Sequence, residues 1–241
     1  MRVEEMTSPG FAEAARGDAV ALVPWGIVEE HGPHLPLGTD TLTAEALCSD
    51  VAARTGALVM PTVAYGNCVS TRNFPGSISI RFDTVRDLAL DIVLELRRSG
   101  VHRIALVSGH AGGGHMRAMK LAAEEAVQAH PELRVAVVTP WDWARAFARE
   151  APASVEGVPE WDGHAGAMET SLAMHLAPGL VRGGATAHRA EFPDPMIVAD
   201  PERYFPSGVL GDPTKADAAR GKAMHGFFVG KLVEVVELLR R

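Results

Sequence analysis

The sequence has few cysteines, no excess of basic residues and no long hydrophobic run, and each absence excludes a class of protein. Only two cysteines, Cys48 and Cys68, occur in 241 residues, so no disulfide framework or C-x-x-C redox motif is present. The formal net charge of -7 argues against a nucleic-acid binder, because phosphate recognition needs basic surface. No stretch approaches the roughly 18 apolar residues that a membrane span needs. We therefore expect a cytoplasmic protein that binds neither nucleic acid nor membrane.

Short apolar runs alternate with amphipathic segments along the chain. Strands are predicted at residues 19–24, 57–60, 102–107 and 133–138, with a further short strand at 77–80. Helices are predicted at residues 40–54, 83–99, 116–129, 169–176 and 216–240. This alternation is typical of a mainly parallel sheet covered by helices on both faces, here within a single domain. In such sheets the functional site lies beyond the carboxyl ends of the strands.

The loop after the first predicted strand is rich in side chains that bind metal ions. It begins with Glu29-Glu30-His31, continues through two prolines and ends at Asp40, where a helix is predicted to start. Glu29 and His31 point the same way if the segment is extended. Carboxylate and imidazole ligands together suit borderline divalent ions such as zinc, manganese or iron. A solvated surface loop is the alternative, but such loops rarely pack proline, glycine, histidine and acids so densely after a buried strand.

Two later segments add further candidates. His110 follows the strand predicted at 102–107 in a glycine-rich loop; taken alone, it is a structural histidine about as often as a ligand. A phosphate-binding loop is disfavoured because the Lys-Ser/Thr pair and the G-x-G-x-x-G spacing are absent. His164 and Glu169 lie just before and in the first turn of the helix predicted at 169–176. Glu169 is also explained by the preference for acids at helix N-termini.

These motifs, in this order, resemble the creatininase (creatinine amidohydrolase) family of metal-dependent amidohydrolases. The resemblance starts with Glu29-x-His31-Gly-Pro-His-Leu-Pro followed by Asp40, and continues through residues 73–79, 108–110, 164–171 and 208–214. It implies one three-layer α/β/α domain over residues 1–241, with a mainly parallel sheet. It also implies a homo-oligomer, often a hexamer.

The resemblance implies two divalent metal ions per chain, which would be zinc, manganese or iron. On the family's pattern, Glu29 and His110 bind one ion, His31 binds the other, and Asp40 bridges the two. Such a pair of ions lowers the pKa of water enough to supply hydroxide near neutral pH. The implied activity is therefore hydrolysis of a carbon–nitrogen bond, in an amide or cyclic amide of a small molecule.

One departure from creatininase itself affects the ligand set. Creatininase has a glutamate two residues after the second-loop histidine, and this chain has Gly112 there. Glu169 is then the expected remaining ligand. His164 is predicted to protonate the leaving nitrogen, because imidazole titrates near neutral pH. Glu30 is predicted as a general base, a role that Glu169 would fill if it is not a ligand.

Three further residues are predicted to support the site. His34 would orient a ligand carboxylate or the loop itself, although a purely structural hydrogen bond explains it equally well. Trp161 would form a wall of the substrate pocket, and Arg72 would reach a site from its loop, across a subunit contact if necessary.

Several substrates and one other class of function stay open. The resemblance covers cyclic amides such as creatinine, formamides and a peptide, so a peptidase or a formamide deformylase is the alternative within the family. A ring-opening hydrolase of a sugar-like ketone, which would break a carbon–carbon bond, also stays open. A non-catalytic metal-binding or nucleotide-binding α/β module is the alternative of another class. A nucleotide site would not need Glu29, His31, Asp40 and His110 together.

Overall fold

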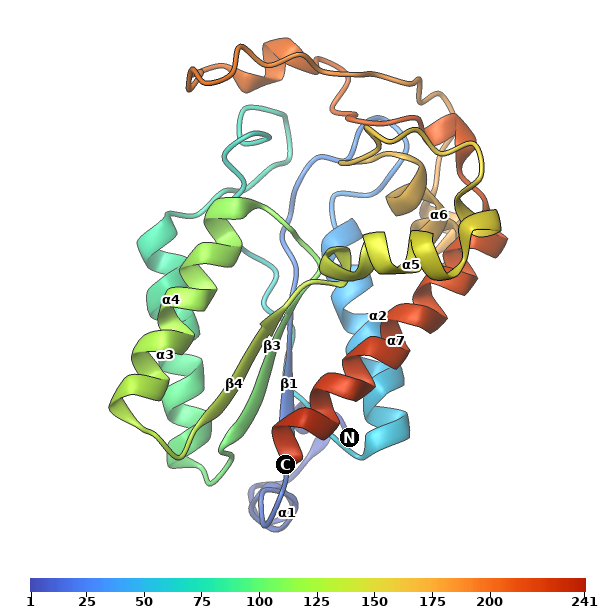
Figure 1. Ribbon diagram of the computed structural model, residues 1–241. Coiled ribbons are helices and arrows are strands. Elements are labelled where there is room, and N and C mark those ends of the chain that lie inside the picture. The colour runs from blue at the N-terminus through green and yellow to red at the C-terminus, as the bar shows by residue number, and fades with distance from the viewer.

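The computed structural model describes residues 1–241 and has a parallel four-stranded sheet between two layers of helices (Figure 1). The strand order is β2-β1-β3-β4, and every neighbouring pair is parallel. The strands are β1 (Val20–Trp25), β2 (Leu58–Val59), β3 (Arg103–Ser108) and β4 (Arg134–Val138). The predicted fold class, a three-layer α/β/α arrangement around a mainly parallel sheet, is confirmed.

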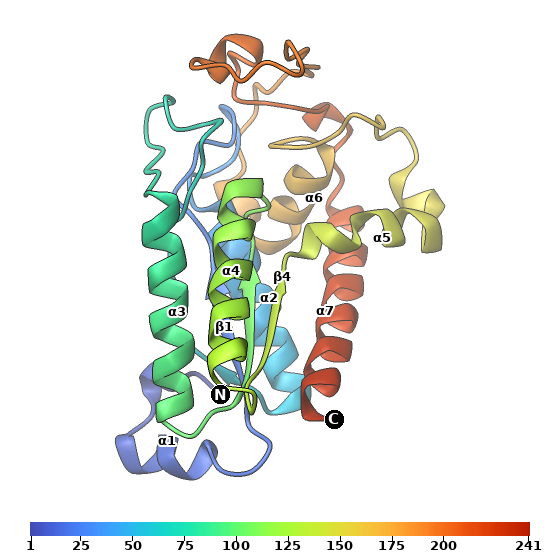
Figure 2. The same ribbon diagram turned by 60° about the vertical axis from the view of Figure 1, so that its left-hand side comes forward.

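Seven α-helices surround this sheet. They are α1 (Ser8–Ala14), α2 (Thr39–Thr55), α3 (Phe82–Arg98), α4 (Gly113–Ala129), α5 (Ala144–Glu150), α6 (Ala167–Leu176) and α7 (Ala218–Arg240). Helices α3 and α4 cover one face of the sheet, and α2 and α7 cover the other (Figures 1 and 2). Each face buries an apolar cluster against the same sheet. This shared sheet supports the proposal that residues 1–241 form a single domain.

The central strands have continuous apolar sequences because they are buried on both faces of the sheet. All six residues of β1 are buried, as expected for a parallel strand with helices on both faces. Helix α2 ends where Gly56 adopts φ 72° and its N–H donates to the carbonyl of Ala52, a common helix-terminating geometry. The broad apolar face of α7 packs on its own sheet, where Met224, Phe228 and Leu232 are fully or almost fully buried.

Some local predictions were wrong. Residues 77–80 form no strand, because Ser79 makes only an isolated bridge with Gly66 and the segment does not join the sheet. The short helices α1 and α5 were not predicted. Each has seven residues, which is too short for a repeating apolar pattern to stand out.

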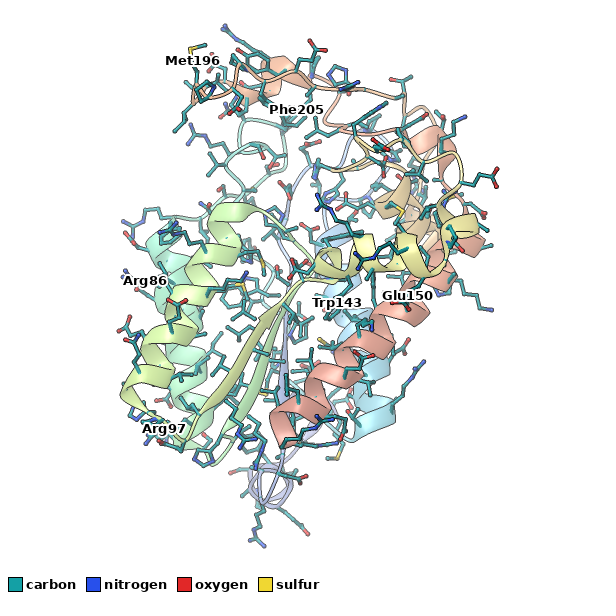
Figure 3. All side chains as sticks on the ribbon, in the orientation of Figure 1. Arg86, Arg97, Trp143, Glu150, Met196 and Phe205 are labelled. Carbon is teal, nitrogen blue, oxygen red and sulfur yellow. The ribbon has the colours of Figure 1, made fainter.

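The chain between α6 and α7 passes over the carboxyl ends of the strands. This segment is drawn in orange at the top of Figures 1 and 2. Phe205 anchors its far part, with its ring fully buried and 5.5 Å from that of Phe74, whereas Met196 lies at the exposed tip (Figure 3). No helix combines the length and apolar character needed to cross a membrane.

Candidate active site

The two central strands bring the predicted loops together. Trp25 at the end of β1 pairs with Ser108 at the end of β3, so the chain leaves both strands at the same level. The β1 loop carries Glu29 and His31, and it leads into the first turn of α2. Backbones approach closely here: a Cβ at Gly109 would lie 2.0 Å from the carbonyl oxygen of Asp40. Glycine at this position therefore lets the His110 loop pack against the start of α2.

Glu29, Asp40 and His110 form one group of ligand-type side chains. Nδ1 of His110 lies 2.9 Å from Oε2 of Glu29 and 3.3 Å from Oδ2 of Asp40. The Thr71 hydroxyl donates to the other oxygen of Glu29. Exposure is only 1% for Glu29, 2% for Asp40 and 8% for His110, so this group is almost completely removed from solvent.

His31, Asp40 and Glu169 form a second group. Nε2 of His31 lies 3.4 Å from Oδ1 of Asp40 and 3.9 Å from Oε2 of Glu169. Nδ1 of His31 donates to the carbonyl of Glu29 at 3.1 Å, which directs Nε2 toward the carboxylates. The ligand atoms within each group lie within 4.8 Å of one another. The structure thus brings all five predicted ligands together, and Asp40 belongs to both groups.

Electrostatics at this cluster depends on charge pairing within it. Burial lowers the pKa of His31, but Asp40 and Glu169 outweigh that effect and raise it to about 10. Burial likewise opposes protonation of His110, and Asp40 and Glu29 raise its pKa to about 10. For Glu29, burial favours the neutral acid, yet the hydrogen bond and charge of His110 hold its pKa below the usual range. Positive charge is therefore required to keep these carboxylates ionised.

The donor set fits divalent ions. Nε2 of His31 and Oδ2 of Asp40 are buried and have no hydrogen-bond partner, and such atoms are costly unless another group satisfies them. Divalent ions would satisfy these atoms and would replace the positive charge that the protonated histidines supply. Gly112 also suits this arrangement, because a Cβ there would lie 2.2 Å from Nε2 of His110.

His164 and Glu30 form a pair beside the cluster. Nε2 of His164 lies 2.8 Å from the carbonyl oxygen of Glu30 and 3.2 Å from its Oε1. Burial and neighbouring His31 lower the pKa of His164, but the Glu30 hydrogen bond and the nearby carboxylates raise it overall. Glu30 does not line the cavity described below, and its Oε2 accepts from the N–H of Gly32 at 2.9 Å. A general-base role for Glu30 therefore finds no support in this geometry.

His34 has a clear hydrogen-bond partner. The imidazole is 1% exposed, and its Nε2 lies 2.8 Å from the Thr170 hydroxyl. It contacts no ligand carboxylate directly. It instead ties the first loop to α6, next to Glu169.

Trp161 and Arg72 do not reach the site in this chain. Trp161 is 37% exposed and is absent from the cavity wall, although its neighbours Glu160 and Asp162 belong to it. Arg72 is exposed and lies in a separate shallow depression with Asn67 and Asn73. The structure therefore gives no support to Trp161 as a wall of the substrate pocket, because its ring is partly exposed to solvent in the loop before α6.

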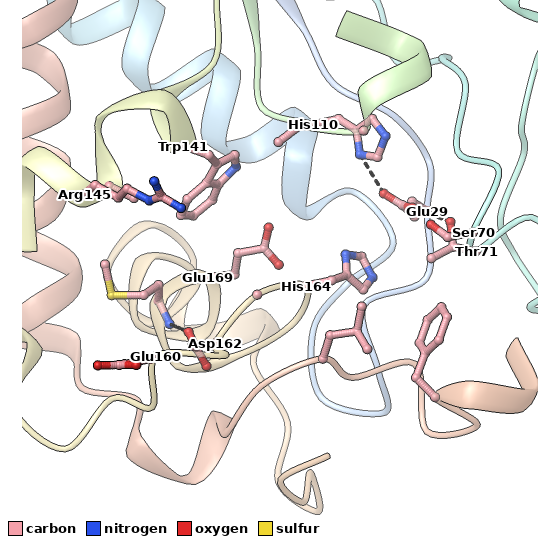
Figure 4. A pocket seen from close by; sticks show the side chains of 17 residues that line it. Glu29, Ser70, Thr71, His110, Trp141, Arg145, Glu160, Asp162, His164 and Glu169 are labelled. Atoms are coloured by element: carbon pink, nitrogen blue, oxygen red, sulfur yellow. Dashed lines mark hydrogen bonds and ion pairs between the residues drawn. The ribbon is translucent and has the colours of Figure 1, made fainter. Parts of the chain in front are cut away.

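A cavity of 530 Å³ opens next to the cluster (Figure 4). Glu29, His110, His164 and Glu169 lie on its wall, and the rest includes residues that the sequence did not single out as part of the site. Trp141 donates its indole N–H to the carbonyl of Gly109 at 2.7 Å. The missed residues with polar side chains are Ser70, Thr71, Arg145, Glu160 and Asp162. Arg145 follows β4 closely, so the rule that located the loops after β1 and β3 would have pointed to it as well.

The fold and the cluster together define a class of protein. A parallel α/β/α fold with buried carboxylates and imidazoles at the carboxyl ends of its strands is the arrangement of a metal-dependent α/β enzyme. Glu29, His31 and His164 form a third such group, and Asp40 is the residue common to the two groups that together contain all five predicted ligands.

Comparison with known proteins identifies the family. The family model described as Creatininase, creatinine amidohydrolase, matches residues 4–236. Creatinine amidohydrolase of Pseudomonas putida is 33% identical over 223 residues, 88% of this chain and 86% of that protein. A mycofactocin precursor peptide peptidase of Mycolicibacterium smegmatis is 36% identical over 218 residues, 84% of this chain and 78% of that protein. The chain belongs to the creatininase family, and the prediction of an amidohydrolase is confirmed.

Solved structures agree with this assignment. A crystal structure of creatinine amidohydrolase has a TM-score of 0.87 at 30% identity, and the match covers 98% of this chain and 96% of that one. A manganese form of creatininase and a zinc–zinc form of a variant are each 29% identical with a TM-score of 0.87. These matches cover 98% of this chain and 97% and 96% of those chains. Creatininase structures therefore carry manganese or zinc, and the prediction of a metal-binding family is confirmed.

Proposed function

We propose that this protein hydrolyses a carbon–nitrogen bond, in an amide or cyclic amide of a small molecule, with two divalent metal ions per chain. The observation that carries the proposal is that the two ligand groups share Asp40. Glu29 and His110 would hold one ion, and His31 and Glu169 the other. When bound, such ions lower the pKa of water and polarise a carbonyl group. Zinc and manganese fit this mixed carboxylate and imidazole donor set, as does iron.

The chain's own residues would then position the substrate and move a proton. His164 lines the cavity beside Glu169, so we assign it to protonate the leaving nitrogen. Glu30 contacts Nε2 of His164 through its backbone carbonyl at 2.8 Å and through its Oε1 at 3.2 Å, so it helps to orient the ring. We therefore treat Glu30 as a positioning residue. The Thr71 hydroxyl orients Glu29.

A second candidate is hydrolysis of a peptide bond. The relative at 36% identity is a mycofactocin precursor peptide peptidase, and a cavity of 530 Å³ has room for two residues of a peptide. A formamide would also fit the cavity. The reaction centre is the same for each of these amides.

One experiment separates these substrates and tests the function. The protein is loaded with manganese or zinc and incubated with creatinine, an N-formyl compound and a short peptide, and product formation is followed by chromatography. We expect one of them to be cleaved, with activity lost on chelation and restored by metal. Cleavage that survives complete metal removal, or a protein that binds no metal, would refute the proposal.

The remaining expectations concern assembly and location. We propose a homo-oligomer, with a hexamer as the expected form, in the cytoplasm. Met196 and Ile197 on the segment between α6 and α7 are 68% and 101% exposed, and an interface with another subunit would give these apolar side chains cover. Sedimentation of the purified protein tests the assembly, and a monomer would exclude it.

A further inference from the structure

Arg145 is the single arginine or lysine side chain on the cavity wall. The wall also carries the carboxylates of Glu29, Glu160, Asp162 and Glu169 and the imidazoles of His110 and His164. Figure 4 shows the guanidinium of Arg145 on the same side of the cavity as Trp141, away from Glu29 and Thr71. Arg145 is exposed to solvent and lines the cavity without an ion pair to any of these acids, so its guanidinium can reach a molecule that enters.

The backbone that carries Arg145 is held firmly. Helix α5 begins shortly after Trp141, whose indole N–H is hydrogen-bonded to the carbonyl of Gly109, next to His110. On the opposite face of α5, Phe147 is 2% exposed and its ring lies 5.5 Å from that of Phe227 on α7. Arg145 therefore stands at a defined position relative to the candidate metal cluster.

The nearby acids do not neutralise Arg145. Asp162 uses its carboxylate to accept from the N–H groups of Ala167, Met168 and Asp212, at 2.8 to 3.0 Å. That carboxylate therefore caps α6 and is already engaged by three backbone donors. Glu160 lines the cavity but makes no ion pair with Arg145, and the carboxylates of the cluster are the proposed metal ligands. The guanidinium is left free to bind an anionic group that enters the cavity.

We propose that Arg145 binds a carboxylate of the substrate and thereby selects for amides that carry one. The class includes peptides with a free C-terminal carboxylate and N-acyl amino acids, and it excludes neutral cyclic amides. A planar guanidinium matches a carboxylate with two parallel hydrogen bonds. The amide would lie at the metal cluster and the carboxylate at α5. The inference rests on the proposed function, because the same cavity would hold the reacting amide.

Paired probes test the role of the charge. The metal-loaded protein is given an N-acetylated dipeptide and an N-formyl amino acid, each with a free carboxylate and as its C-terminal carboxamide. Kinetics gives kcat/KM for probes that are cleaved, and calorimetry gives Kd for probes that are not. We expect the wild type to prefer the carboxylate forms about 10- to 100-fold, the usual worth of a charge-assisted pair. Arg145→Gln should abolish this preference, and Arg145→Lys should restore part of it.

Arg149 provides a matched control, because it is an exposed arginine one turn further along α5 and does not line the cavity. Arg149→Gln should keep the full preference and the metal content of the wild type. Equal binding of the carboxylate and carboxamide forms by the wild type would overturn the inference. So would failure of the carboxylate probes to bind, or a preference that survives Arg145→Gln. If probes bind with the expected preference but none is cleaved, the proposed hydrolysis of these amides fails while the role of Arg145 stands.

Discussion

The cavity has two walls that are built in different ways. The sheet wall consists of Glu29 and His110, with His31 and Asp40 buried behind them. These four residues follow β1 and β3 and are no more than 8% exposed. The outer wall consists of Arg145, His164 and Glu169, which come from α5, α6 and the loop between them. The side chains of His164 and Glu169 are 17% and 12% exposed, and Arg145 is exposed.

The difference in burial suits the two walls to different tasks, metal binding and substrate selection. A ligand that leaves a strand of a buried parallel sheet cannot move without disturbing the core, so the sheet wall suits the precise geometry that metal ions need. Helix ends and loops tolerate changes in side chain more readily, so the outer wall suits contacts that distinguish substrates. We therefore expect substitutions in the sheet wall to affect metal binding and those in the outer wall to affect turnover or selectivity.

The largest effect is expected from Asp40→Asn. Asp40 belongs to both ligand groups, and the amide has the same shape but lacks the charge that holds a cation. Both metal ions should be lost, and activity should fall by about 10³-fold or more. Mass spectrometry measures the loss of metal, and turnover of the best substrate measures the loss of activity.

Asp50 on the same helix gives the control for this change. It lies at the surface and pairs with His225 at 2.8 Å, so Asp50→Asn should keep both metal ions. An Asp40→Asn protein with a full complement of metal would show that Asp40 is not a ligand.

Glu169→Gln tests whether a residue of the outer wall also binds a metal ion. Glu169 is the one proposed ligand in the outer wall, and its Oε2 also accepts from the N–H of Ala165 at 2.5 Å. We expect one ion to be lost and the other retained, with activity reduced by about 10²-fold. A protein that keeps both ions but loses turnover would instead make Glu169 a general base.

Glu30→Gln should have a smaller effect that leaves the metal untouched. Glu30 orients His164 and does not line the cavity, so kcat should fall by about 10-fold with unchanged metal content, as for other groups that support an acid–base residue. His164→Ala should lower kcat further, and combining the two changes should add little. If the two losses were simply additive, Glu30 would not act through His164.

The last effect concerns the stability of the fold in acid and leaves activity aside. His115 lies behind the sheet wall with its ring 5.4 Å from that of His110. Burial, with a contribution from His110, lowers the pKa of His115 to about 3. The folded protein therefore keeps this ring neutral, whereas the unfolded chain takes up a proton below pH 6.5. The contribution of neutral His115 to the free energy of unfolding is therefore complete above that pH. It should decrease by about 2 kcal/mol between pH 7 and pH 5.

Comparison with His115→Gln isolates this contribution. The free energy of unfolding is measured by urea denaturation at both pH values for each protein. The variant is less stable at pH 7, because it loses packing against Trp25, but its stability should decrease by about 2 kcal/mol less on acidification. An identical decrease in both proteins would show that His115 takes up its proton as readily in the folded state.

The sheet wall was predictable from sequence, and most of the outer wall was not. The order of strands and helices already placed the loops after β1 and β3 at one edge, and the dense Glu29–Asp40 segment marked the first of them. Glu169 and His164 came from the family pattern, since an acid in the first turn of a helix is common without function. Arg145 lies in a seven-residue helix that no periodicity revealed, and the partial exposure of Trp161 depends on side-chain packing.

Glu30 illustrates a further limit of the sequence. It adjoins the proposed ligand Glu29 in the chain, so proximity favoured a direct role, but successive residues of an extended segment point to opposite sides. Glu29 therefore faces the cavity, whereas Glu30 turns toward His164 and the backbone of Gly32. Only the three-dimensional structure distinguishes a residue that contacts the reacting groups from one that orients such a residue.

The central claim is that Asp40 is shared by two metal ions at the carboxyl ends of β1 and β3. A crystal structure of the manganese- or zinc-loaded protein, with anomalous difference maps collected at the metal's absorption edge, tests it most directly. We expect two peaks per chain, with one oxygen of Asp40 bound to each ion, Glu29 and His110 on one and His31 and Glu169 on the other. A single peak, or two peaks that Asp40 does not join, would contradict this account.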